Sequence, residues 1–346
     1  MAFTQLDRGL SRAARALVHE HFDVQPDEEV LISADGRTES ALIDALVAAV
    51  LAAGAQPMVM SIPALPYQGT LADPFVPAAL GAAAAASDVW LDLCFPYLAG
   101  STLHDRAMQA GRTRYALLAS AGAASFARLY GSVDFAALMD CQCAWVDYLD
   151  ARAGATVRFT CPSGSDVRFT LDKIKLKRER VARSPGMHTV PGAQSLYPVL
   201  SSVTGRIVLH ALFDEHYRPL RRPITLAVDG RLEGFEGAAA EDRPCLERAL
   251  RRAGGGEGVR LIHFTLAFHP GARNTGRHFI EDIRSLGTNA IGMGLPWWEQ
   301  GGGENHPDGI VFDQSLWLDG EPVLEAGRIV GPPGLVPLIE RLELRG

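Results

Sequence analysis

The sequence has few cysteines and no long apolar run. Its five cysteines are odd in number and scattered through 346 residues, which argues against a disulfide framework. No segment approaches the roughly 18 uninterrupted apolar residues of a membrane helix. The first residues, Met1-Ala-Phe-Thr, lack the basic-then-apolar pattern of a signal peptide. We therefore expect a cytoplasmic protein with reduced thiols and no membrane partner.

The sequence also lacks a basic excess and the usual nucleotide motifs. Its net charge is −7, whereas a nucleic-acid-binding surface normally shows a basic patch, so we expect no nucleic-acid partner. Neither GxGxxG nor a P-loop follows the first expected strand, so the first half gives no sign of binding a nucleotide.

The pattern of apolar residues predicts two domains. In the first half, an apolar run at residues 29–34, a helical pattern at 38–53 and a second apolar run at 56–62 predict a β-α-β unit with a parallel sheet. After about residue 150, alternating hairpin strands replace this pattern. We expect an N-terminal α/β (βαβ) domain at residues 1–150 and a C-terminal α+β metal-binding domain at 151–346.

A possible metal site follows a glycine-rich stretch near the C-terminus. In Gly301-Gly-Gly-Glu-Asn-His-Pro-Asp308, His306 and Asp308 are two residues apart and would point to the same side of an extended chain. His263, in a strand-like segment, would complete two histidines and one carboxylate, the facial triad of non-haem Fe(II) oxygenases. Zinc accepts the same ligands. The alternative is that His263 is a core histidine of a sheet and that His306-Pro-Asp308 forms a turn.

Four further residues are candidates near such a site. His269, six residues after His263 and just before a turn, is an alternative ligand or a base. His188 lies in a Pro/Gly-rich segment and is a candidate general base or an exposed loop histidine. At most one of Trp297 and Trp298 would face the site, and Trp298 is the candidate aromatic wall.

Three segments carry a resemblance to a known family. Residues 263–272, 286–294 and 301–311 resemble the C-terminal domain of the thermophilic aminopeptidase superfamily, and within it 2,5-dihydroxypyridine 5,6-dioxygenase, a ring-opening enzyme. The resemblance covers most of residues 150–325 and implies the fold of the thermophilic aminopeptidases for the C-terminal domain.

Departures from the peptidase pattern indicate which branch the chain resembles. His263 stands where the peptidases carry glutamate, Gln194 where another ligand glutamate would fall, and Asn289 near a ligand histidine. A neutral amide cannot replace a carboxylate at a dimetal centre. The resemblance therefore implies one Fe(II) held by His263, His306 and Asp308.

Other roles are also implied by the resemblance. His188 lies one residue from the family's loop histidine, and Tyr97 or His104 lies near the place of an N-terminal histidine of the family.

These observations predict an extradiol-type dioxygenase that opens a hydroxylated aromatic or N-heteroaromatic ring with O2. Asn289, Glu304 and Arg273 are candidates for hydrogen bonds to substrate polar groups. A homo-oligomer is expected by analogy. The alternatives are a metal-dependent aminopeptidase-like hydrolase with two metals, and a non-catalytic accessory protein on the same scaffold.

Overall fold

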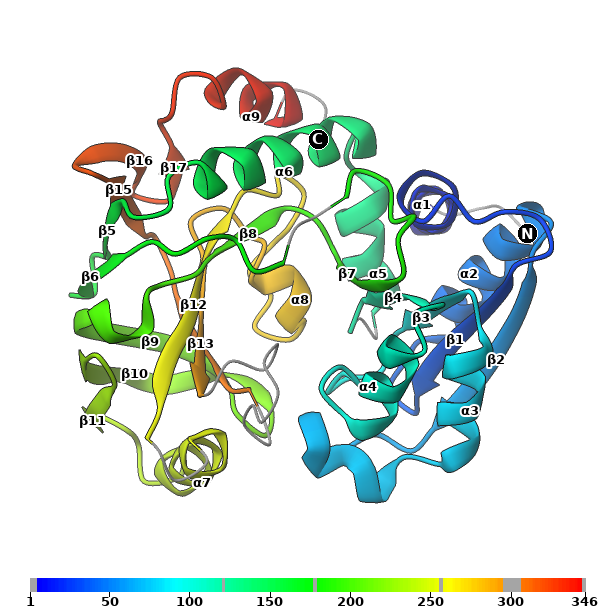
Figure 1. Ribbon diagram of the computed structural model, residues 1–346, viewed down its shortest axis with the longest axis horizontal. Helices are drawn as coiled ribbons and strands as arrows, with labels where there is room; N and C mark the ends of the chain where they lie inside the picture. The colour runs from blue at the N-terminus through cyan, green and yellow to red at the C-terminus, as the bar shows by residue number, and fades with distance from the viewer. Residues whose placement is uncertain (1–4, 120–121, 177–178, 255–257, 295–305, 344–346) are drawn as a thin grey trace. The chain divides into compact units, whose positions relative to one another are not determined.

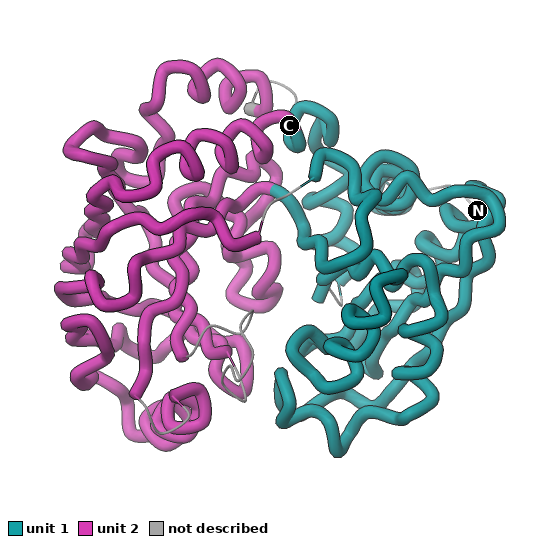
Figure 2. Tube along the Cα trace, viewed as in Figure 1, with its two compact units in different colours: residues 1–139, 178–191, 345–346 teal, residues 140–177, 192–344 magenta. Residues whose placement is uncertain are grey.

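The chain forms two compact units. The computed structural model describes residues 5–119, 122–176, 179–254, 258–294 and 306–343. Unit 1 comprises residues 1–139, 178–191 and 345–346, and unit 2 comprises residues 140–177 and 192–344 (Figure 2). Residues 178–191 therefore return to unit 1, which the change of pattern near residue 150 did not indicate. A domain boundary near residue 150 stays a prediction.

The sheet of unit 1 is parallel, as the β-α-β pattern predicts. Its order is β2-β1-β3-β4-β7 (Figure 1). The strands are β1 (Glu29–Asp35), β2 (Gln56–Ile62), β3 (Val89–Asp92), β4 (Arg114–Leu117) and β7 (Gly186–Thr189). Every neighbouring pair is parallel. The last strand, β7, comes from the Pro/Gly-rich segment around His188, whose composition gave no strand signal.

Helices connect these strands on both faces of the sheet. They are α1 (Gln5–Arg15), α2 (Ser40–Ala52), α3 (Ala78–Ala86), α4 (Thr102–Gln109) and α5 (Ala123–Phe126), with a 3-10 turn at Gly69–Phe75 and π turns at Ala16–His21 and Ala127–Gly131. The chain moves from β1 to β2 in one direction and from β2 back across β1 to β3 in the other. Right-handed crossovers therefore place α2 and α3 on opposite faces. α1 packs against α2, and α4 packs against α3.

A buried carboxylate ties the carboxyl ends of β1, β3 and β4 together. Asp92 is fully buried and accepts hydrogen bonds from the Ser33 and Tyr115 hydroxyls, each at 2.7 Å. It also accepts the backbone N–H groups of Cys94 and Leu98, at 3.2 and 3.0 Å. Burial raises the pKa of Asp92 above its usual range, although these hydrogen bonds oppose the shift. The loop after β3 is thus held by a side chain of the sheet itself.

Unit 2 is built on a large sheet of antiparallel pairs. The order is β17-β16-β15-β5-β6-β9-β14-β13-β12-β8, with β10 on β9 and β11 on β10. The strands are β5 (Thr156–Thr160), β6 (Asp166–Thr170), β8 (Ala193–Leu196), β9 (Thr204–Phe213), β10 (Tyr217–Asp229), β11 (Leu232–Glu236), β12 (Arg260–Ala267), β13 (Asn289–Gly294), β14 (Asp308–Val311), β15 (Ser315–Leu318), β16 (Glu321–Glu325) and β17 (Arg328–Ile329). The α+β character predicted for the second half is confirmed.

Aromatic side chains fill the core of unit 2. Phe264 on β12 stacks on Phe169 at 4.5 Å between ring centroids and lies 5.4 Å from Phe159. Trp145 of α6 lies 6.3 Å from Phe268, beside the end of β12. These contacts anchor β12 at Phe264 and the chain just beyond its end at Phe268. The helices are α6 (Phe135–Asp150), α7 (Arg243–Ala253), α8 (Phe279–Asp282) and α9 (Val336–Glu343), with a 3-10 turn at Leu200–Ser202. The chain passes from unit 1 to unit 2 within α6.

All five cysteines are free thiols. Among the described residues, no helix combines the length and the apolar character that crossing a membrane requires.

We expect Asp92→Ala to lower the free energy of unfolding by about 3 kcal/mol or more, because it leaves two hydroxyl and two backbone donors buried without their acceptor. Urea unfolding followed by circular dichroism measures the change. Asp44→Ala, at an exposed position of α2, is the control and should change stability by no more than about 0.5 kcal/mol. Equal effects of the two substitutions would contradict the role given to Asp92.

Candidate metal centre

Three neighbouring strands of unit 2 bring the predicted ligands together. His263 on β12 pairs in register with Gly292 on β13, and Gly292 pairs with Asp308 at the start of β14. His306 lies two residues before Asp308, just ahead of β14, and its side chain approaches Asp308 as predicted. Side chains in register across a sheet share a face. This row across three strands therefore places the His263 and Asp308 side chains on the same face of the sheet, with Gly292 of β13 between them.

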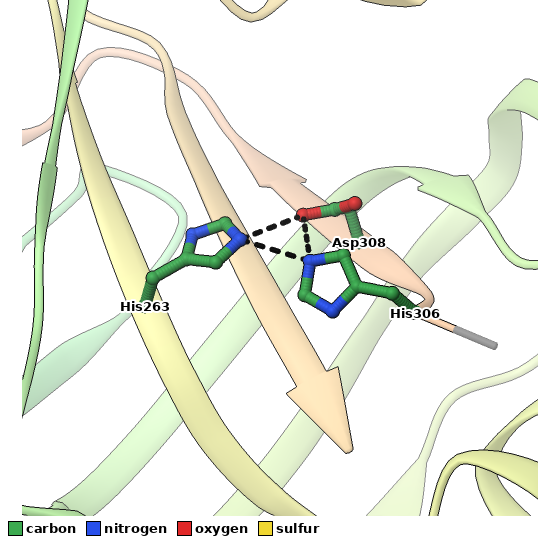
Figure 3. A group of neighbouring side chains, drawn as sticks. All are labelled: His263, His306 and Asp308. Carbon is green, nitrogen blue, oxygen red and sulfur yellow. Dashed lines mark hydrogen bonds and ion pairs between the residues drawn. The ribbon is translucent and has the colours of Figure 1, made fainter. Parts of the chain in front are cut away.

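The three side chains meet at their polar atoms. His263 Nε2 and His306 Nε2 are 3.0 Å apart, and each lies 3.5 Å from Asp308 Oδ1. Figure 3 shows the two rings and the carboxylate converging in front of β13. Among the described residues, this is the one group of three or more His, Cys, Asp or Glu side chains with the spacing of a metal site.

The absence of a side chain at Gly292 makes this convergence possible. A Cβ atom at Gly292 would overlap Nε2 and Cδ2 of His263 and Cε1 of His306. Gly292 has ordinary strand φ, so the glycine is needed here for space and not for backbone conformation. Sequence reasoning did not single out Gly292. The signal was a glycine between two large apolar residues inside a strand, Ile291 and Met293, but its meaning depends on strand register.

The electrostatics of the group favour neutral histidine. Burial lowers the pKa of His263 to about 4; the Asp308 carboxylate opposes this shift, and the His306 ring adds to it. The His263 ring is therefore neutral at pH 7. A neutral imidazole and an ionised carboxylate are the forms that bind metals.

The donor spacing fits one metal ion. Two ligands about 2.1 Å from a shared ion, at right angles to one another, are separated by about 3.0 Å, and at a tetrahedral angle by about 3.4 Å. The observed separations of 3.0 and 3.5 Å are equal to the first value and close to the second. The residues present therefore fit a single ion.

Other predicted residues of unit 2 lie outside this group. His269 is fully buried, and its Nδ1 accepts the N–H groups of Gly271 and Ala272, each at 3.1 Å, so it closes the turn after β12. Arg273 is exposed on the loop after that turn. Their roles as base and substrate contact stay proposals.

Asn289 joins strands of the sheet. Its Oδ1 accepts the N–H of Thr265 at 2.8 Å, and its Nδ2 donates to Gln314 Oε1 at 3.0 Å. The structure thus shows both ends of the amide engaged by the protein. It supports a structural role for Asn289, beside the substrate contact that the resemblance suggested.

The remaining predicted residues are placed elsewhere or not described. His188 lies on β7 of unit 1, where its Nε2 is 2.9 Å from the Ser184 carbonyl oxygen and its ring meets Phe22 edge-on. Tyr97 follows β3 in unit 1 and is largely buried. Glu304 and Trp298 lie outside the described residues.

Gln194, which the resemblance places where the peptidase pattern has a ligand glutamate, is paired with a second amide. Gln194 on β8 is buried, and its Oε1 accepts from Gln142 Nε2 at 2.7 Å. Gln142 Oε1 in turn accepts the N–H of Gly192 at 3.0 Å. This pair of amides holds α6 to β8 and provides no charge for a second ion.

The fold and this group of side chains define a two-unit α/β protein with a candidate metal site of two histidines and one carboxylate. The sequence matches the family described as NicX: 2,5-dihydroxypyridine 5,6-dioxygenase over residues 13–331. The chain belongs to this family, as its motifs indicated. Family membership supports a ring-cleaving dioxygenase and, with the three-residue group, a metal site.

Solved structures show the same fold. The 2,5-dihydroxypyridine dioxygenase of Pseudomonas putida KT2440 superposes with a TM-score of 0.71 and 16% identity, covering 96% of this chain and 99% of that one. Wild-type AmpT of Thermus thermophilus superposes with a TM-score of 0.63 and 14% identity, covering 94% and 100%. A comparison with curated proteins finds no match.

We expect Gly292→Ala to lower divalent-metal affinity at least about tenfold, because the added methyl group displaces both imidazoles from the shared position. Titration of the metal-free protein with Fe(II) under anaerobic conditions measures this. Gly234→Ala is the matched control, because Gly234 also lies in a strand of unit 2 and a Cβ there meets nothing within 4 Å. An unchanged Fe(II) affinity in Gly292→Ala would show that metal binding does not require a position without a side chain at residue 292.

We also expect the metal-free protein to lose stability between about pH 6.5 and pH 4 through His263. Its pKa of about 4 in the folded protein lies below the ordinary value of about 6.5, so the unfolded chain takes up the proton first as the pH falls. Urea unfolding at pH 7 and pH 4.5 should show a loss in wild type that exceeds the loss in His263→Gln by about 2–3 kcal/mol. His216→Gln, at an exposed histidine, should behave as wild type. An identical pH dependence of stability in all three proteins would show that His263 does not cause the loss of stability at low pH.

Proposed function

We propose that this protein is a mononuclear non-haem Fe(II) dioxygenase that opens a hydroxylated aromatic or N-heteroaromatic ring, of the pyridine type, with O2. The observation that carries the proposal is the group formed by His263, His306 and Asp308 in a chain of the 2,5-dihydroxypyridine 5,6-dioxygenase family. Two histidines and one carboxylate on one face are the ligand set of Fe(II) oxygenases with open coordination positions.

The three side chains would hold the ion and set its charge. Two neutral imidazoles and one carboxylate contribute a single negative charge, so a divalent ion bound to them keeps one positive charge. That charge favours an ionised ring hydroxyl over a neutral one. Ferrous iron bound there would supply the redox chemistry that lets dioxygen react with an aromatic ring, and it would hold the two reactants side by side.

The protein's own groups then have defined tasks. Asp308 has an exposed fraction of only 3%, so its charge acts in a poorly solvated environment, where electrostatic attraction is strong. The aromatic ring must give up a hydroxyl proton before ring opening, and His188 and His269 are the proposed bases. Asn289, Glu304, Arg273, Trp298 and Tyr97 are proposed substrate contacts.

The reaction proposed is of the extradiol type and is balanced without a further reductant. One ring C–C bond beside a hydroxyl-bearing carbon breaks, and both atoms of O2 enter the ring-opened product. The hydrolase alternative is less favoured, because Gln194, which the resemblance places at a peptidase ligand glutamate, is a neutral amide paired with Gln142.

Replacing His306 or Asp308 with alanine should abolish both iron binding and oxygen uptake. Wild type, reconstituted with Fe(II) without oxygen, is expected to bind one iron per chain and to consume O2 as the ring absorbance of 2,5-dihydroxypyridine disappears. Each variant should lose at least about 100-fold in turnover, more than the loss of a partner outside the ligand set usually causes. Other hydroxypyridines and aminophenols would then define the substrate range.

His216→Ala is the control for these variants, because His216 is exposed and is not part of the ligand group. Wild-type iron content and oxygen uptake in His306→Ala or Asp308→Ala would end the proposal. Two metals per chain, together with peptide hydrolysis in the absence of oxygen, would support the hydrolase alternative.

A further inference from the structure

A serine and a histidine of unit 2 form a close pair at the turn between β5 and β6. Ser163 is exposed in that turn, and its Oγ lies 2.7 Å from Nε2 of His210 on β9. A serine hydroxyl within hydrogen-bond reach of an imidazole nitrogen is the arrangement by which histidine activates serine as a nucleophile. Neither residue belongs to the metal ligands or to the proposed substrate contacts of the dioxygenase.

The turn that carries Ser163 is fastened to β9. The Gly164 carbonyl oxygen accepts a hydrogen bond from Arg206 Nε at 2.8 Å. Ser165 Oγ accepts the backbone N–H of Val208 at 2.8 Å. Both residues that follow Ser163 are therefore attached to the strand that carries the histidine, and the serine hydroxyl is held beside its base by the fold.

The ring of His210 is also held, and it is kept neutral. It stacks on Phe312 with 5.3 Å between the ring centroids, and its Nδ1 is buried. Burial lowers the pKa of His210, although the backbone of Ile310 and the carboxylate of Asp313 oppose the shift. A neutral ring can accept the serine proton at Nε2, and the two opposing groups stabilise the imidazolium that results.

The guanidinium of Arg206 lies over the residue that follows the serine. Its Nη2 would be 2.8 Å from a Cβ atom at Gly164. Within the described part of the chain, the one hydrogen bond of this guanidinium is the one that Nε donates to the Gly164 carbonyl. Its Nη atoms can therefore donate to a carboxylate of a molecule bound at Ser163.

Positive charge is in excess around this turn. Asp166, at the start of β6, pairs with Arg158 through two hydrogen bonds of 2.9 and 2.8 Å. This pair lowers the pKa of Asp166, and Arg168 and Arg206 contribute to the shift. Three guanidinium groups thus act on one carboxylate, although the whole chain has a net charge of −7. Such a local field attracts an anionic substrate.

We propose that Ser163 and His210 form a catalytic dyad that hydrolyses small esters with an anionic acyl group, whose carboxylate Arg206 binds. Ser163 Oγ attacks the ester carbonyl carbon, and its proton passes to His210 Nε2. The ester C–O bond breaks, and the alcohol leaves with that proton. Water, deprotonated by His210, then cleaves the acyl-serine and releases the acid. No atom changes its oxidation state, so water is the one co-reactant.

Hydrolysis of the monoester 4-nitrophenyl hydrogen succinate by the full chain tests the proposal. Wild type should hydrolyse it equally with and without EDTA, because the dyad contains none of the proposed metal ligands. Ser163→Ala and His210→Gln should each lower kcat/KM at least about 100-fold. Ser201→Ala is the matched control, because Ser201 is another exposed serine of unit 2, and it should behave as wild type.

Circular dichroism verifies that these variants are folded. Wild-type hydrolysis no faster than that of Ser163→Ala, or hydrolysis that EDTA abolishes, would overturn the dyad.

A fluorophosphonate probe tests the nucleophile directly. Peptide mass spectrometry should find the label on Ser163, and wild type should be labelled at least about tenfold faster than His210→Gln. A label on another residue would overturn the role of Ser163, and equal rates would overturn its activation by His210.

The role of Arg206 is tested with two esters. Arg206→Gln should raise the KM for 4-nitrophenyl hydrogen succinate at least about tenfold, because the acyl carboxylate loses its charged partner. The KM for 4-nitrophenyl acetate, which has no such carboxylate, should change much less. Equal changes for the two esters would overturn the carboxylate contact.

Discussion

The register of β12, β13 and β14 is the constraint on which the candidate site depends. It places His263, Gly292 and Asp308 in one row, so that two ligands flank a position without a side chain. A shift of one residue in either pairing would send one ligand to the opposite face of the sheet. The register is secured away from the ligands, by the hydrogen bonds of Asn289 to Thr265 and Gln314 and by the packing of Phe264.

Part of the fold and of the candidate site follows from local sequence. The strand at 56–62 has the limits that its apolar run predicts, because the run is a local pattern ended by a proline. The approach of His306 to Asp308 is also local, since alternation in an extended chain suffices. Residue type and a strand-like setting suggested His263 as the third ligand, and the family resemblance gave the same set. Its approach to residues 43 and 45 positions later depends on strand order, which local sequence does not determine.

What the sequence could not provide depends on contacts between distant segments. Gly292 matters because two histidine rings from other strands occupy the space beside it. β7 is a strand because β4 offers it an edge, although its own composition is that of a loop. Asn289 and Gln194 are both buried amides, and their partners, Gln314 and Gln142, are 25 and 52 residues away. No local rule could assign those pairs.

The return of residues 178–191 to unit 1 has a consequence for how the protein is made. The parallel sheet receives its fifth strand only after the ribosome has synthesised α6, β5 and β6, which contribute to unit 2. Until then β4 remains an open edge in the nascent chain, with the aggregation hazard that such edges bring. A fragment truncated after α6 would keep that open edge permanently, so the N-terminal unit is not obtained intact by cutting the gene at one place.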